Sequence, residues 1–184
     1  MEHIVTFTGE EFKPLDPDAA KIRIEDIAHS LSLLCRANGH VDYFFSIAQH
    51  SINCANEAKA RGYPARVQLA CLIHDASEAY ISDITRPVKL YLAEYKVIEH
   101  RLQNVIYSKF LDLVEDDELN SVDQIDNDML VHEFNALMKN RIKLEELPLL
   151  YSTPSFDCRV QAEVETEFLK MYYGIMHAGL IQGR

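Results

Sequence analysis

Apolar residues recur at helical spacing along most of this chain, which restricts the fold to one built mainly from amphipathic helices. The first such segment spans residues 24–35, and its apolar positions are Ile24, Ile27, Ala28, Leu31, Leu34 and Cys35. Similar patterns predict further helices over residues 43–61, 64–80, 88–110, 118–140 and 157–177. Residues 3–12 alternate around Gly9 and predict a short hairpin. The expected fold class is therefore all-α, with a short N-terminal β-hairpin.

The size of the chain permits a substantial hydrophobic core. It has 184 residues, of which 48% are hydrophobic, and it contains no internal repeat, low-complexity tract or long linker. We therefore expect residues 1–184 to form a single domain. The 18 Lys and Arg residues are outnumbered by 29 Asp and Glu residues, for a net charge of −11. Binding to a nucleic-acid polymer needs a concentrated basic face, so this charge balance argues against such a partner.

The sequence also bears on location. No stretch approaches the ~20 consecutive apolar residues of a membrane span, and the first residues lack the layout of a signal peptide. We expect a cytoplasmic protein with no membrane partner. The four cysteines, Cys35, Cys54, Cys71 and Cys158, lie far apart and form no Cys-x-x-Cys motif, which argues against disulfides. Three of them fall in apolar helical runs, which favours buried free thiols.

The predicted helix over residues 64–80 is apolar on most sides, yet it contains His74, Asp75 and Glu78. On a helical wheel these three residues fall within an arc of about 100°. Isolated charges in an apolar interior are costly, so these groups must be paired, hydrogen-bonded or bound to a metal. A core histidine held by an aspartate is the structural alternative.

Two other predicted helices contain inward-facing ionisable residues. Asp126 lies within the apolar stripe of residues 118–140, and Glu133 shares that stripe, where it would support a neighbouring residue. His50 lies at the margin of the apolar face of residues 43–61. The two imidazoles and two carboxylates of His50, His74, Asp75 and Asp126 form an N/O ligand set for one divalent ion. The ligand types do not distinguish among Co, Mn, Zn, Ni, Fe and Mg.

The order and spacing of these residues resemble a known family. Gln49-His50-Ser51, His74-Asp75-Ala76-Ser77-Glu78, Asp83 and Asp126 follow the H…HD…D order of the HD-domain phosphohydrolase superfamily. Over about residues 24–133 the chain resembles bacterial 5′-deoxynucleotidases and phage HD-type dATP triphosphohydrolases. The resemblance implies an HD-domain helical bundle, a homo-oligomer, and a metal-dependent hydrolase of 5′-deoxynucleotides. The reaction would convert a dNMP to deoxynucleoside and phosphate, or a dNTP, with dATP favoured, to deoxynucleoside and triphosphate.

The resemblance also implies a role for each matching residue. His50, His74, Asp75 and Asp126 correspond to the metal ligands of the family. Glu78 corresponds to the acid that handles the proton of the attacking water, and Asp83 to a residue beside the sugar and phosphate of the substrate. Arg36 and Lys89 correspond to phosphate-binding residues, and Pro87 to the base pocket. For Arg36, Arg86 and Lys89, a solvated surface cation is the alternative to a phosphate contact.

One position departs from the family, and two alternative functions remain. Ala37 stands where relatives have an aromatic residue that packs on the nucleoside, which leaves base and sugar selectivity open. Only His100 lies between the His-Asp pair and Asp126, so one metal is favoured over two. A dinuclear HD oxygenase or cyclic-dinucleotide phosphodiesterase is one alternative. A nucleotide-binding regulator that retains a metal for stability is the other.

Overall fold

The computed structural model describes residues 2–111, 115–138, 141 and 146–182. These residues are mostly helical, and two short strands pair antiparallel near the N-terminus, which confirms the predicted fold class. In the hairpin, Ile4 of β1 (Ile4–Val5) lies opposite Phe12 of β2 (Glu11–Phe12). The α-helices are α1 (Ile24–Leu33), α2 (Ile47–Ala60), α3 (Ala65–Leu72), α4 (Glu78–Ile81), α5 (Arg86–Lys89), α6 (Ala93–Phe110), α7 (Asp116–Leu137) and α8 (Gln161–Gln182). Two 3₁₀ turns are η1 (Ala19–Lys21) and η2 (Arg36–Gly39).

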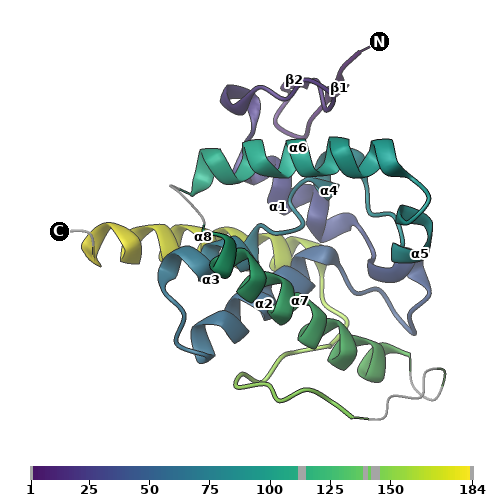
Figure 1. The fold of residues 1–184 in the computed structure, drawn as a ribbon, viewed down its shortest axis with the longest axis vertical. Coiled ribbons are helices and arrows are strands. Elements are labelled where there is room, and N and C mark those ends of the chain that lie inside the picture. The colour runs from purple at the N-terminus through teal and green to yellow at the C-terminus, as the bar shows by residue number, and fades with distance from the viewer. Residues whose placement is uncertain (1, 112–114, 139–140, 142–145, 183–184) are drawn as a thin grey trace.

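Helix α2 lies at the centre of the bundle, where it contacts α1, α3, α7 and α8. Figure 1 shows the hairpin at one end of the molecule, α6 next to it, and α7 toward the other end. The core contains fully buried side chains from several of these helices, including Ile27, Ile47, Leu72, Ile125 and Phe168. In the part of the chain that the structure describes, no helix is both long enough and apolar enough to cross a bilayer.

A capping box determines where α2 begins. The Ser46 Oγ accepts a hydrogen bond from the backbone N–H of Gln49 at 3.1 Å, and the Gln49 Oε1 accepts one from the backbone N–H of Ser46 at 3.2 Å. This reciprocal pair satisfies two backbone donors that the first helical turn leaves without partners. The helix therefore begins at Ile47, later than the predicted residue 43. His50 lies one turn inside it and is fully buried.

Two predicted helices are interrupted, and for these the prediction of one continuous helix was wrong. The first, residues 64–80, ends as α3 at Leu72 and resumes as α4 at Glu78. Ile73 leaves the helical region of the backbone, and residues 74–77 form consecutive turns. The second, residues 88–110, is divided into α5 and α6 by residues 90–92. At the first break the apolar periodicity persists because the chain is buried on both sides of the turn, whereas α5 and residues 90–92 beside the second break contain no buried residue.

Candidate metal centre

Three segments that are distant in sequence meet at the candidate site. His50 comes from the first part of α2, His74 and Asp75 from the turn after α3, and Asp126 from the middle of α7. Helices α2, α3 and α7 contact one another pairwise, which brings these segments together. The turn matters because neighbouring residues on a helix point about 100° apart, so a continuous helix would separate His74 from Asp75. The break in the predicted helix allows both side chains to face the same point.

The four predicted ligands converge closely. The His50 Nε2 lies 3.2 Å from the His74 Nε2, 3.1 Å from the Asp126 Oδ1 and 3.8 Å from the Asp75 Oδ2. The His74 Nε2 lies 3.3 Å from the Asp75 Oδ2 and 3.8 Å from the Asp126 Oδ1. Four nitrogen and oxygen atoms therefore surround a single point.

The other ring nitrogens determine how both histidines face this point. The His74 Nδ1 lies 2.8 Å from the backbone carbonyl oxygen of Cys71, which only accepts hydrogen bonds, so Nδ1 is the donor. The His50 Nδ1 lies 2.7 Å from the Glu133 Oε1. Burial opposes ionisation of Glu133, but the charges of His50 and Arg36 outweigh burial and lower the pKa of Glu133. Its carboxylate therefore accepts a hydrogen bond from the His50 Nδ1–H. With Nδ1 protonated in both neutral rings, each Nε2 presents a lone pair to the other and to two carboxylates.

This arrangement strongly favours a positive charge at the centre. Burial alone would lower the pKa of His74, yet Asp75 and Asp126 raise it well above its usual value. The pKa of His50 is also raised, because Glu133 and Asp126 outweigh burial and the charge of Arg36. The carboxylates thus favour protonated histidines, and a metal cation between the four side chains would balance the same negative charge.

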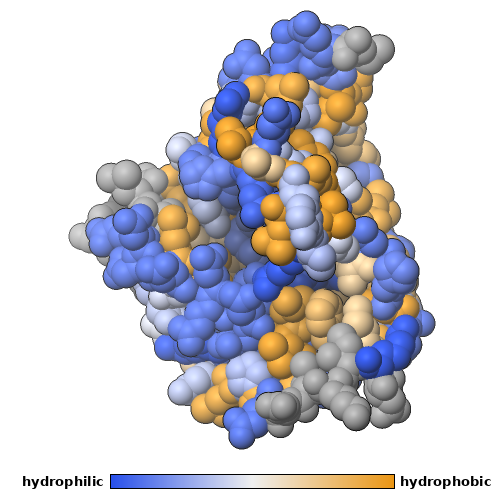
Figure 2. Space-filling view, turned by 45° about the vertical axis from the view of Figure 1, so that its right-hand side comes forward, coloured by the Kyte–Doolittle hydropathy of each residue, from blue (hydrophilic) through white to orange (hydrophobic). Residues whose placement is uncertain are grey.

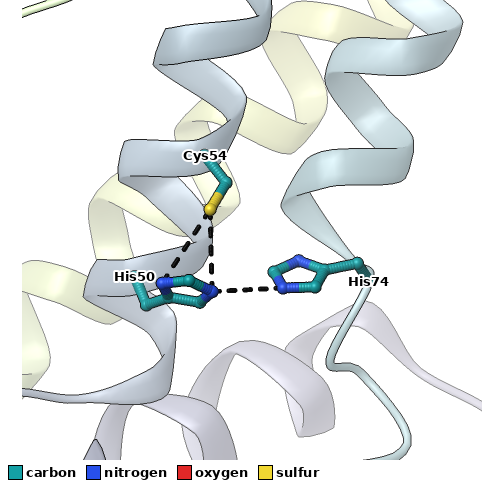
Figure 3. A group of neighbouring side chains, drawn as sticks. All are labelled: His50, Cys54 and His74. Carbon is teal, nitrogen blue, oxygen red and sulfur yellow. Dashed lines mark hydrogen bonds between the residues drawn. The ribbon is translucent and has the colours of Figure 1, made fainter. Parts of the chain in front are cut away.

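Cys54 is a further potential ligand beside these histidines, although its sequence context predicts only a buried free thiol. The ligand atoms of His50, Cys54 and His74 all lie within 4.8 Å of one another. Figure 3 shows the Cys54 sulfur and the His74 ring on either side of the His50 Nε2. The Cys54 Sγ is nearly equidistant from the two ring nitrogens of His50, at 3.6 Å from Nε2 and 3.8 Å from Nδ1. Its spacing of one helical turn from His50 could have identified it. Burial raises the pKa of this thiol well above its usual value.

A cavity of about 280 Å³ adjoins the convergent ligands. Figure 2 shows a face of the molecule that is hollowed near its centre, with hydrophilic side chains in the hollow and hydrophobic ones beside it. The structure places every predicted substrate-binding residue on the cavity wall. The lining residues are Arg36, Ala37, Asp75, Glu78, Asp83, Ile84, Thr85, Arg86, Pro87, Lys89, Asp126, Leu130 and Phe134.

Arg36 and Lys89 are both held by carboxylates, so the alternative of solvated surface cations is wrong. The Arg36 guanidinium lies 3.5 Å from Asp75 and 3.2 Å from Glu133, and its side chain is only 12% exposed. The Lys89 Nζ lies 2.6 Å from the Glu99 Oε1, with Glu78 at 3.4 Å. Both cations are therefore fixed at the cavity.

Carboxylates on the cavity wall have distinct environments. The Glu78 Oε2 is buried and has no hydrogen-bond partner in the described part of the chain. Burial, reinforced by Asp75 and Asp83, raises the pKa of Glu78 well above its usual value. The Asp83 Oδ1 lies 3.9 Å from the Lys89 Nζ. Asp126 is shared, because its Oδ1 faces the histidines while its Oδ2 accepts a hydrogen bond from Arg86 at 2.9 Å.

The backbone beside Arg36 is strained. Ala37 and Asn38 have φ values of 51° and 50°, in the left-handed region that a residue with a Cβ rarely adopts. Such a conformation costs roughly 1–2 kcal/mol and is common at functional sites. The strained turn brings Ala37 to the cavity wall, and its small side chain leaves room where an aromatic residue would fill the space.

Comparisons with known proteins find similarity but assign no activity. No protein-family model matches this chain. It is 39% identical over 110 residues to the uncharacterized protein YfdR of Escherichia coli, covering 60% of this chain and 59% of that protein. It is 38% identical over 109 residues to an uncharacterized protein of Rhodobacter capsulatus, covering 56% and 55%. The chain thus spans less than two thirds of either relative, and any functional conclusion depends on the geometry of the site.

Proposed function

We propose that this chain is a metal-dependent phosphohydrolase of the HD type that acts on 5′-deoxynucleotides. The observation that carries the proposal is the convergence of four acceptor atoms, His50 Nε2, His74 Nε2, Asp75 Oδ2 and Asp126 Oδ1, with the histidine protons directed away from the centre. Four acceptors need a cation between them. The remaining support comes from the cavity beside them, which contains both fixed cations and an apolar wall.

The ligand atoms suit one divalent ion. Ligands held about 2.1 Å from an ion lie roughly 3.0–3.4 Å from one another, close to the separations of 3.1–3.8 Å in this cluster. His50, His74, Asp75 and Asp126 would hold the ion, while Cys54, over the face of the His50 ring, would remain outside the set. When bound, the ion would polarise a phosphoryl oxygen and lower the pKa of a coordinated water.

The cavity wall has a cationic part that suits the phosphate of a nucleotide and an apolar part that suits its nucleoside. Arg36 and Lys89 would contact the phosphate, since a guanidinium has five donors and its two carboxylate partners do not occupy them all. The apolar side of the wall, formed by Ala37, Pro87, Leu130 and Phe134, would face the nucleoside. The volume of about 280 Å³ suits one small molecule.

Glu78 is the residue best placed to handle a proton. Its Oε2 has no partner in the described part of the chain, and the residue lines the cavity beside Asp75. In this position Glu78, in its ionised form, would accept a proton from the attacking water and release it to the leaving oxygen. Asp83 would keep the Lys89 ammonium near the phosphate and lie beside the sugar.

The test is chromatographic product analysis of deoxynucleoside mono- and triphosphates incubated with the protein and Co²⁺, Mn²⁺ or Mg²⁺. Orthophosphate from dNMPs supports a 5′-deoxynucleotidase, and intact triphosphate from a dNTP supports a triphosphohydrolase. Nucleotide binding without any product would contradict the proposal and favour the metal-stabilised regulator. Two metal ions per chain in an elemental count would favour the dinuclear alternative.

A further inference from the structure

Arg86 connects a wall of the cavity to a candidate metal ligand. It is the first residue of α5, which also contributes Pro87 and Lys89 to the cavity wall. Its Nη2 donates a hydrogen bond to the Asp126 Oδ2 at 2.9 Å, and its Nη1 donates one to the Asn127 Oδ1 at 2.8 Å. The guanidinium of Arg86 therefore spans two consecutive residues of α7, one of which faces the candidate metal centre.

Charged contacts, rather than the core, hold α5 in its position. In residues 82–92, all of which the structure describes, no residue is buried. At the first residue of α5, Arg86 contacts Asp126 of α7, and at the last residue, the Lys89 Nζ lies 2.6 Å from the Glu99 Oε1 of α6. A segment with little buried apolar surface has low local stability, so a few contacts determine where it lies. The contact with Asp126 is one of these contacts.

The two oxygens of Asp126 face different partners. Its Oδ1 lies 3.1 Å from the His50 Nε2, and its Oδ2 accepts the hydrogen bond from Arg86. The carboxylate is a rigid group, so a contact that fixes one oxygen also fixes the direction of the other, and outer hydrogen-bond partners orient metal ligands in this way. The Arg86 guanidinium would also repel a divalent ion, but the side chain is 61% exposed and water screens this repulsion. Orientation of Asp126 is therefore the stronger effect.

We propose that Arg86 is a positioning residue that couples metal binding to the placement of α5 over the cavity. It acts through Asp126, and this inference rests on the metal centre of the proposed function. Coupling between two sites is reciprocal. Loss of the Arg86 contact should therefore weaken metal binding, and metal binding should hold α5 in place. The wall formed by α5 would be complete only in the metal-loaded protein, which would then bind its substrate after the metal.

Calorimetric titration with Mn²⁺ at pH 8 tests the effect of Arg86 on the metal. Arg66→Gln is the matched control, because Arg66 is another exposed arginine that contacts a carboxylate of α7, Glu118, at 2.6 Å but does not line the cavity. We expect Arg86→Gln to weaken Mn²⁺ binding roughly tenfold and Arg66→Gln to bind like the wild type. Arg86→Lys should have an intermediate affinity, since an ammonium keeps the charge without the planar fork that spans Asp126 and Asn127.

Hydrogen exchange of the α5 backbone tests the effect of the metal on α5. The amides of Lys89 and Leu90 donate hydrogen bonds to the carbonyl oxygens of Thr85 and Arg86, so their exchange reports whether this turn is formed. Saturating Mn²⁺ should slow this exchange several-fold in the wild type and in Arg66→Gln. In Arg86→Gln, at a Mn²⁺ concentration that saturates the variant, the exchange of α5 should not respond to the metal.

The outcomes separate this inference from the proposed function. Wild-type Mn²⁺ affinity in Arg86→Gln, tighter binding in that variant, or α5 exchange that is unchanged or faster with Mn²⁺ would overturn the coupling and leave the metal centre intact. A wild-type protein that binds no Mn²⁺ would contradict both. Coupling of Mn²⁺ to α5 without turnover of any nucleotide would support the role of Arg86 and contradict the phosphohydrolase proposal.

Discussion

The Nε2 atoms of His50 and His74 lie 3.2 Å apart, although each imidazole donates its Nδ1 proton in another direction, to Glu133 and to the carbonyl oxygen of Cys71. Two neutral imidazoles in these tautomers present facing lone pairs, which repel one another. A proton or a metal ion between them removes the repulsion. This relationship favours a cation between the two rings and leads to the first prediction.

Metal affinity should increase with pH. Burial lowers the pKa of both histidines, but Asp75, Asp126 and Glu133 outweigh it and raise the pKa values above the usual range. Below the raised pKa the histidines are protonated and repel a divalent ion, and above it they are free to bind. Calorimetric titration with Mn²⁺ should show tighter binding at pH 8 than at pH 6, with protons released to the buffer. Affinity independent of pH would show that the histidines are not ligands.

Replacing Glu133 should weaken metal binding although it contacts no ion. Its Oε1 orients His50, and its Oε2 lies 3.2 Å from the Arg36 guanidinium. Outer carboxylates of this kind are worth roughly 10–100-fold in metal affinity. We expect Glu133→Gln to lose affinity in that range while its far-UV circular dichroism stays native. Asp117→Asn, at an exposed position on the same helix, is the control and should bind metal like the wild type.

Cobalt spectroscopy should distinguish two possible ligand sets. In one, the two histidines bind the ion together with Asp75 and Asp126, and in the other Cys54 takes the place of one aspartate. The Cys54 Sγ lies over the face of the His50 ring, and burial keeps this thiol protonated. We therefore expect the Co²⁺ protein to lack the near-ultraviolet thiolate charge-transfer band, and Cys54→Ser to have the same visible spectrum. A charge-transfer band in the wild type that disappears in Cys54→Ser would contradict this expectation. It would show that Cys54, in place of one aspartate, is a metal ligand.

Glu78→Gln should greatly reduce turnover without loss of stability. Removing a positioned general acid or base costs roughly 10²–10⁴-fold in rate, and we expect a decrease in kcat within that range. Burial, with Asp75 and Asp83, raises the pKa of Glu78, so ionisation destabilises the fold as pH rises through that pKa. The neutral variant should therefore unfold at the same or a higher temperature at pH 8. Glu94→Gln, on the exposed surface, is the control, and full activity in Glu78→Gln would remove Glu78 from the mechanism.

The buried Glu57 should make stability depend on pH in the acidic range. Its carboxylate accepts hydrogen bonds from the Tyr151 and Ser152 backbone, the Ser152 hydroxyl and Arg61. Burial opposes ionisation, but these donors outweigh it and lower the pKa. The resulting stability is present above the usual carboxyl pKa and is lost as pH falls through the lowered pKa.

Glu57→Gln should cost about 1–3 kcal/mol in the free energy of unfolding at pH 7. The difference between the variant and the wild type should shrink as the pH is lowered, because protonated Glu57 also loses its charge. Urea unfolding at several pH values measures both effects. Asn56→Ala, at the exposed neighbouring position, should change stability little, and an equal loss in both variants would refute the role of the buried carboxylate.

The periodic apolar residues and the hairpin pattern were sufficient to predict the helical fold, because they are local properties of the chain. The residue types at His50, His74, Asp75 and Asp126 were also sufficient to suggest a ligand set, since buried ionisable groups need partners. The position of Glu133 on the same helical stripe as Asp126 predicted that it would support a neighbouring residue. In the structure that neighbour is His50, whose Nδ1 contacts the Glu133 carboxylate.

The local pattern of the chain is thus enough to show that it is mainly helical and which side chains cannot be buried alone. The break in the predicted helix over residues 64–80 depends on the packing of the helices, and that turn allows His74 and Asp75 to face one point. The same packing also decides that Arg36 and Lys89 are held by carboxylates, that Cys54 lies over the His50 ring, and that Arg86 of α5 reaches Asp126 of α7. Apolar periodicity reports only which side of each segment is buried. Distances between segments far apart in sequence depend on how the helices pack, and no local pattern contains that information.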